Sequence, residues 1–143
     1  MIYFISGHRD LSRTDFADYT IKILHVANPK NGDKKVEFVV GDCDGADKFA
    51  MNFIYMTFVD GLFPPKVKAK LTIYHMGDSP RNTPFDIPVE ELEKRGVKFV
   101  GEFRSDEERD SAMTRDSDFD IAFVKDDRWD RGTAQNIKRR HNI

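Results

Sequence analysis

Short apolar runs rich in β-branched and aromatic residues recur along the chain. Four of them stop at a glycine, and longer stretches of mixed character separate them. Strands that are buried on both faces read as nearly continuous apolar runs, so these segments suit a parallel sheet. The pattern predicts five strands, over residues 2–6, 36–40, 70–76, 97–100 and 119–124.

Helical patterns lie between these strands. Ser12 and Asp15 favour a helix start ahead of apolar positions at roughly 3.6-residue spacing, and Ser105 with Glu108 forms a capping-box pattern. Pro88 suits the first turn of a short helix. These signals predict helices over residues 16–26, 45–59, 88–96, 105–117 and 131–140, with a loop over 77–88.

The alternation of strands and helices defines the fold class. Repeated βα units imply a parallel sheet with right-handed crossovers, and a length of 143 residues suits one domain. We therefore predict a single α/β domain over residues 1–143, with a three-layer, Rossmann-like arrangement. Its mostly parallel sheet of about five strands is flanked by helices. Such a small sheet has exposed edges, which favours a homodimer.

Composition narrows the class of protein further. The chain is 39% hydrophobic and 34% charged with a net charge of −2, which argues against a disordered segment and against a duplex nucleic acid partner. One cysteine excludes an intramolecular disulfide and disfavours a zinc site. No apolar run approaches the roughly 18 residues of a membrane span. We expect a cytoplasmic protein with no membrane partner, and we assign it no cofactor and no metal.

Polar residues and glycines gather where the predicted strands end. In an open parallel sheet, ligands bind outside the carboxyl ends of the strands, near the point where the strand order reverses. This rule predicts a ligand site formed by Gly7, His8, Arg9, Gly41, Asp44, Gly45, Asp47, Arg109, Arg131, Gly132 and Thr133.

The start of the last predicted helix has the chemistry of an anion site. Gly132 lets the backbone come close to a ligand, the helix dipole favours an anion, and Thr133 adds a hydroxyl. A simple capped helix start explains the same residues. Arg109 stands where the dipole prefers an acid, which either phosphate recognition or an ion pair with Asp106 or Asp110 explains.

The other loop residues have two interpretations each. The aspartates of the 41–47 loop suit ribose hydroxyls or a divalent cation, or else they cap the next helix. His8 is an acid–base candidate or an exposed loop histidine. Cys43 is a thiolate activated by a helix start, or a thiol that neighbouring carboxylates keep neutral. Trp129 stacks on a base or covers its loop.

Three segments together resemble the SLOG superfamily, which includes LOG-type phosphoribohydrolases and the DprA- and YAcAr-like nucleotide-sensing domains. They are residues 5–9, residues 39–50 with their glycine and Gly45-Ala46-Asp47 pattern, and residues 108–137 with Gly132-Thr133. The resemblance implies a Rossmann-like fold that holds a nucleotide phosphate at Gly132 and Thr133, and it adds Asn136 to the predicted ligand site.

The resemblance also bears on catalysis. In the hydrolases, an arginine matching Arg109 and a glutamate matching the position of Asn136 perform the N-glycosidic chemistry. An amide cannot act as the base, so a hydrolase would need another carboxylate. We therefore expect a domain that binds or senses a nucleotide-derived ligand, or alternatively an N-glycosidase for nucleoside 5'-monophosphates in which Arg109 and Asp44 are catalytic. The substitute carboxylates are Asp42, Asp44, Glu108 and, least favoured because it precedes the fifth strand, Asp118.

Overall fold

The computed structural model contains a sheet of five parallel strands and describes residues 1–28, 30, 35–60, 68–123 and 132–141. The strand order is β4-β3-β2-β1-β5, so the chain winds outward from β1 through β4 and then returns to place β5 on the other side of β1. The strands are β1 (Ile2–Ser6), β2 (Val36–Val40), β3 (Ala69–Met76), β4 (Lys98–Phe103) and β5 (Phe119–Ala122).

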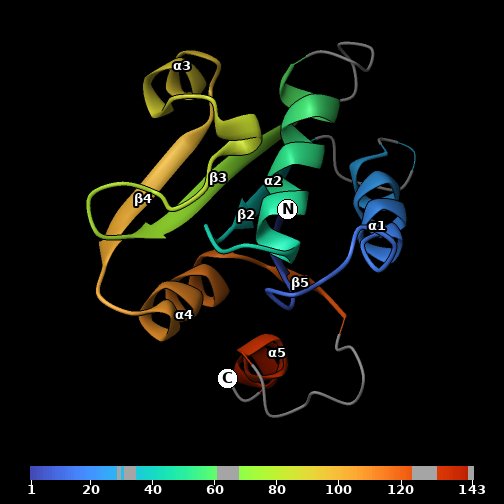
Figure 1. Cartoon of the computed structure of the whole chain (residues 1–143). Coiled ribbons are helices and arrows are strands. Elements are labelled where there is room, and N and C mark those ends of the chain that lie inside the picture. Colours follow the sequence, from blue (N-terminus) through green and yellow to red (C-terminus); the bar gives the residue numbers. More distant parts are fainter. Residues whose placement is uncertain (29, 31–34, 61–67, 124–131, 142–143) are drawn as a thin grey trace.

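Helices cover both faces of this sheet and give three layers (Figure 1). On one face lie α1 (Ala17–Ala27), α2 (Ala46–Ile54) and α3 (Val89–Lys94), and on the other lie α4 (Asp106–Asp116) and α5 (Gly132–His141). Residues Tyr55–Val59 continue α2 as a π-helical turn, and Pro84–Asp86 form a 3-10 turn. The three-layer parallel α/β fold predicted from the hydrophobic pattern is thereby confirmed.

The two faces bury apolar side chains unequally. The larger core includes Ile5 and Tyr19 and fills the space between the sheet and α1, α2 and α3. The smaller core lies under α4 and comprises Phe4, Val39, Tyr74, Ala112 and Met113. Successive side chains of a strand point to opposite faces, so Ser6 projects to the same side as Phe4, where α4 and α5 lie.

The predicted cap is confirmed for α4 but not for α1, whose N-cap residue is Phe16 and has no side-chain cap. Ser105 Oγ accepts a hydrogen bond from the Glu108 amide at 3.1 Å, which confirms the predicted cap of α4. The Asp15 amide donates to Ser12 Oγ at 3.1 Å, one turn before α1 begins. β4 differs from its prediction, because it continues through Gly101 to Phe103. A Cβ on Gly101 would lie 2.2 Å from the His75 ring, so the glycine makes room for this buried histidine.

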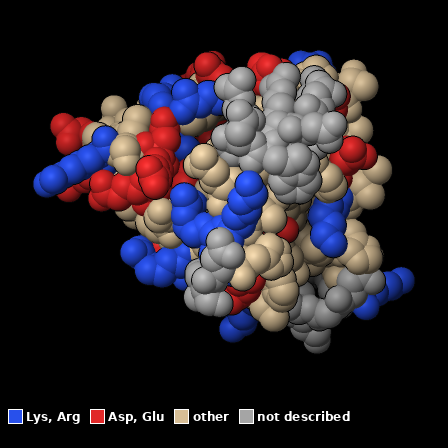
Figure 2. Space-filling view, turned by 90° about the horizontal axis from the view of Figure 1, so that it is seen from below, with Lys and Arg blue, Asp and Glu red and all other residues tan. Residues whose placement is uncertain are grey.

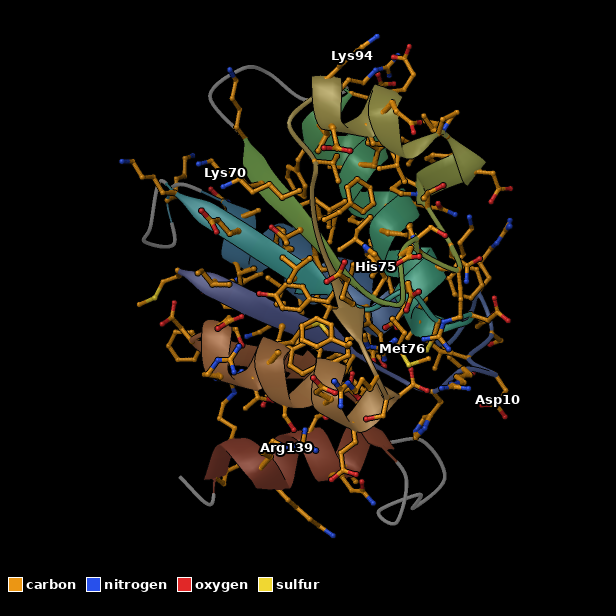
Figure 3. All side chains as sticks on the ribbon, turned by 90° about the vertical axis from the view of Figure 1, so that its left-hand side faces the viewer. Asp10, Lys70, His75, Met76, Lys94 and Arg139 are labelled. Carbon is orange, nitrogen blue, oxygen red and sulfur yellow. The ribbon has the colours of Figure 1, made fainter. Side chains whose placement is uncertain are left out.

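The strand order reverses at β1, and all strands end on one side of the molecule. In Figure 3, Lys70 near the start of β3 and Met76 at its end lie on opposite sides, and Asp10 lies on the side of Met76. Ligands of open α/β sheets bind at this edge, next to the reversal. Within the described residues, no helix has the length and apolar character needed to cross a membrane.

Candidate functional site

A pocket of about 570 Å³ opens at the carboxyl end of β1, between the β1 loop, α4 and α5. Its wall combines a polar rim with two apolar side chains of the smaller core, Phe4 and Met113. The lining residues are Phe4, Ser6, Gly7, His8, Arg9, Asp10, Cys43, Asp47, Asp106, Arg109, Asp110, Met113, Gly132, Thr133 and Asn136.

Most of the residues predicted for a site meet at this pocket. Those on its wall are Gly7, His8, Arg9, Asp47, Arg109, Gly132, Thr133 and Asn136. His8 is buried, so the alternative of an exposed loop histidine is wrong. Asp44 is turned away, and its carboxylate accepts a hydrogen bond from Asn82 Nδ2 at 3.0 Å. Arg131 and Trp129 lie outside the described residues.

Gly41 and Gly45 support the pocket without lining it in the described structure. A Cβ on Gly41 would lie 2.7 Å from Asp47 Oδ2 and 2.8 Å from Arg109 Cζ, so only glycine leaves room for these two side chains. Gly45 has a φ of +73°, and a Cβ there would lie 2.3 Å from the Arg9 carbonyl oxygen. The β1 and β2 loops therefore pack together through backbone.

Arg109 lies under the pocket with 3% of its surface exposed and is surrounded by carboxylates. Its Nη1 donates to Asp42 Oδ1 at 2.8 Å and lies 3.1 Å from Asp106 Oδ1. Its Nε and Nη2 both donate to Asp110 Oδ1, at 3.2 and 2.9 Å. The ion-pair explanation of this arginine therefore holds in the structure, and its guanidinium is occupied by protein groups.

Arg81 completes this cluster and was missed by the sequence reasoning. It comes from the loop after β3 and binds Asp42 through its backbone amide at 2.8 Å and through Nη2 at 2.8 Å. The Asp42 side chain is fully buried. Burial raises the pKa of Asp42, but the hydrogen bonds from Arg81 outweigh burial and hold the pKa below its usual value. Arg81 also donates to Asp106 Oδ1 at 2.7 Å, and Arg9 donates to Asp106 Oδ2 at 2.5 Å.

Asp47 is the carboxyl group whose ionisation the pocket changes most clearly. It is 6% exposed, and its Oδ2 accepts a hydrogen bond from the Cys43 amide at 3.1 Å. Burial raises the pKa of Asp47 to about 7 although nearby Arg109 lowers it. Burial also raises the pKa of the Cys43 thiol, and Asp47 adds to that effect. Of the two alternatives for Cys43, an activated thiolate and a neutral thiol, the structure therefore favours the neutral thiol.

Ser6 provides a buried hydroxyl on the pocket wall that has no hydrogen-bond partner in the described structure. The residue is 5% exposed, and its carbonyl oxygen already accepts a hydrogen bond from Tyr19 Oη at 2.6 Å. Sequence reasoning overlooked Ser6, although it is a polar residue that ends an apolar strand. The same wall contains Gly132 and the buried Thr133, where α5 begins.

Asn136 lies one turn into α5 and faces Asp110. Its Nδ2 donates to Asp110 Oδ2 at 3.4 Å, and its Oδ1 accepts from Arg139 Nη1 at 2.7 Å. Arg139 therefore fixes the orientation of the amide, with nitrogen toward the carboxylate. The position where the resemblance would require a glutamate thus contacts an aspartate from α4.

None of the four substitute carboxylates proposed from the sequence lines the pocket in the described part of the chain. Each of them is bound by another group of the protein. Asp42 and Asp44 are held by Arg81, Arg109 and Asn82 as described above. Glu108 Oε2 accepts a hydrogen bond from the Arg104 amide at 3.2 Å. Asp118 Oδ2 accepts from the Ile2 amide at 2.8 Å, at the start of β1 and so at the opposite end of the sheet. The carboxylates on the pocket wall are Asp10, Asp47, Asp106 and Asp110.

No protein-family model, curated protein or solved structure matches this chain at a significant level. Among the described residues, no group of three or more histidine, cysteine or acidic side chains is arranged to hold a metal ion. On the face shown in Figure 2, lysines and arginines are interspersed with acidic and uncharged side chains. Duplex DNA binders usually present a basic stripe or patch.

Proposed function

We propose that this chain binds a nucleotide, or a ligand derived from one, with its phosphate against the amino end of α5. The observation that carries the proposal is the unpartnered, buried Ser6 hydroxyl on the same pocket wall as Gly132 and Thr133. At the start of this ten-residue helix lie backbone N–H groups that have no partner within the helix, together with the positive end of the helix dipole. A phosphate there could accept hydrogen bonds from these groups and from the Ser6 hydroxyl.

The charged residues on the pocket wall are mostly acidic. Four aspartates and two arginines line it, and Arg109 is already occupied by Asp42 and Asp110. Carboxylates repel a phosphate but accept hydrogen bonds from sugar hydroxyls and from amino groups of a base. A ligand with an anionic end and a donor-rich remainder suits this wall. A volume of about 570 Å³ lies in the range of small-molecule pockets.

Binding can be tested by calorimetry with nucleoside 5'-monophosphates, NAD, ADP-ribose and the corresponding nucleosides without phosphate. We expect phosphate-bearing ligands to bind and the nucleosides to bind far more weakly. A Cβ on Gly132 meets no described atom within 4 Å, so Gly132→Leu places a side chain in open space on the pocket wall. This variant is expected to bind phosphate-bearing ligands about tenfold or more weakly. A loss of this size corresponds to one hydrogen bond to a charged group.

Gln135→Leu is the matched control, because it adds the same side chain to an exposed position of α5 that is not on the pocket wall. It is expected to bind as the unchanged protein does. Nucleosides that bind as tightly as their monophosphates would contradict the proposal, as would a Gly132→Leu variant that retains full affinity.

A second candidate function, N-glycosidase activity, is favoured by Asp47. A buried carboxyl with a pKa of about 7 is protonated in about half of the molecules at pH 7, and this protonated form could donate its proton to a departing base. In this reaction the bond between base nitrogen and sugar carbon breaks, and the nitrogen takes the electron pair and the Asp47 proton. Water then supplies hydroxide to the sugar carbon and returns a proton to Asp47.

Chromatography of free base tests this second candidate with the same panel of monophosphates. We expect base release that disappears in Asp47→Asn and is unchanged in Asp44→Asn, whose side chain lies outside the pocket. Absence of release at high protein concentration, while the monophosphates bind, would leave the binding function and exclude hydrolysis.

A further inference from the structure

Asp110 has one carboxylate oxygen committed to the protein and one that makes a single long contact within the described residues. Oδ1 accepts both Nε and Nη2 of Arg109, at 3.2 and 2.9 Å, which fixes the position of the carboxylate. Oδ2 has a single described contact, the long 3.4 Å hydrogen bond from Asn136 Nδ2. A carboxylate offers about four lone-pair sites, so Oδ2 retains the capacity to accept from a ligand. The residue lines the pocket, with 17% of its side chain exposed.

The surroundings of Asp110 keep this oxygen available. Asn136 cannot turn its own oxygen toward the pocket without losing the 2.7 Å hydrogen bond from Arg139. Arg109, which orients the carboxylate of Asp110, is itself fixed by a 2.8 Å hydrogen bond to Asp42. Asp110 is therefore a rigidly held acceptor, and a rigid group loses less entropy when it binds a ligand.

The location of Asp110 relative to the start of α5 specifies which part of a ligand it meets. Asn136, its contact, lies four residues after Gly132, and four residues of α-helix rise about 6 Å. This spacing corresponds to the length of one pentose. The Ser6 hydroxyl is a second observation, independent of the helix start: Ser6 is 5% exposed, lines the same pocket and has no hydrogen-bond partner for its hydroxyl among the described residues.

We infer that Asp110 holds the sugar of the ligand, by accepting a hydrogen bond from a ribose hydroxyl through Oδ2. The inference depends on the proposed function and adds to it a substrate class, namely 5'-phosphorylated riboses that have hydroxyls on C2' and C3'. Arg109 then acts as a positioning residue, because it orients the acceptor and does not touch the ligand.

The experiment compares the four ribonucleoside 5'-monophosphates with their 2',3'-dideoxy counterparts and with inorganic phosphate. Dissociation constants are measured by NMR titration or calorimetry for the unchanged protein, Asp110→Asn and Glu107→Gln. Glu107 is an exposed acid of the same helical turn that does not line the pocket, so its variant controls for the loss of one negative charge. Should Asp110→Asn not fold, Asp110→Ser removes the carboxylate with a smaller polar side chain.

The unchanged protein and Glu107→Gln are expected to bind the ribose ligands at least about tenfold more tightly than the dideoxy ligands, which one hydrogen bond to a charged group accounts for. In Asp110→Asn this ratio is expected to fall to near one, with the affinity for inorganic phosphate retained. Equal binding of both sugars by the unchanged protein, or a ratio that survives in Asp110→Asn, would overturn the inference and leave the proposed function intact. Failure of phosphate and of every nucleotide to bind would overturn both.

Discussion

Asp47→Asn tests the electrostatics of the pocket without a ligand. In the folded protein, burial raises the pKa of Asp47 to about 7 from its ordinary value of 3.8. The folded state therefore binds more protons than the unfolded state between these two pH values, so this group lowers stability as the pH rises through the interval. The stabilising contribution is complete below about pH 3.8 and is lost above about pH 7. Asparagine resembles the neutral carboxyl and lacks this titration.

The size of the effect follows from the pKa difference. Each pKa unit corresponds to about 1.4 kcal/mol, so the whole shift amounts to about 4 kcal/mol. Between pH 5 and pH 7 the unchanged protein should lose about 2.5 kcal/mol of stability through this group. Asp42 and Asp106 have lowered pKa values, so their contributions disappear only when the pH falls below the usual range of an aspartate. They do not interfere above pH 5.

Urea denaturation followed by circular dichroism, at intervals from pH 5 to pH 8.5, measures the free energies of unfolding. The advantage of Asp47→Asn over the unchanged protein should grow by about 2.5 kcal/mol from pH 5 to pH 7 and then level off. Asp44→Asn, an exposed change in the same loop, should run parallel to the unchanged protein. A difference that stays constant or shrinks with rising pH would refute the reasoning, because Asp47 would then ionise in its ordinary range.

Two further changes test the packing around the pocket. Arg109→Met removes the partner of a fully buried Asp42 and should cost about 3–5 kcal/mol in urea denaturation; a loss below 1 kcal/mol would mean that the buried cluster is not held by this arginine. Gly7→Ala would place a Cβ 2.4 Å from Ala46 Cβ and 2.5 Å from Tyr19 Oη and should cost about 1–3 kcal/mol, whereas Gly132→Ala should leave the midpoint unchanged. Equal stability of the two glycine variants would contradict the packing at Gly7.

The elements that could be predicted from the sequence are those with strong local signals. β1, β2 and β3 contain buried apolar residues because helices cover both faces of the sheet, and their apolar runs were found from that property. Ser105 could be identified as the cap of α4 because its spacing to Glu108 is sufficient for the hydrogen bond observed. The pocket edge was predictable because a parallel sheet ends all its strands on one side.

The features that were missed depend on contacts between distant parts of the chain. Arg81 lies in a proline-containing loop, and nothing near it in the sequence indicates that it binds Asp42 at a separation of 39 residues. Because parallel strands end at the same edge of the sheet, the loop after β3 also had to lie near the pocket. Arg81, the one arginine in residues 77–88, was the signal that could have been used. The extension of β4 past Gly101 likewise depends on His75, which needs the space that a side chain would fill.

Two charge arrangements that are each unfavourable in the local sequence compensate each other in the structure. An arginine in the first turn of α4 opposes the helix dipole, and three aspartates between β2 and the first turn of α2 repel one another. Each arrangement is unfavourable alone, but Asp42 binds Arg109 directly, and Gly41 leaves the space in which Asp47 approaches it. The charge of Arg109 therefore compensates the buried aspartates only when α4 packs against the β2 loop. The same cluster fixes Asp110 on the pocket wall, so the energetic reason for the fold and the geometry of the candidate site are the same set of contacts.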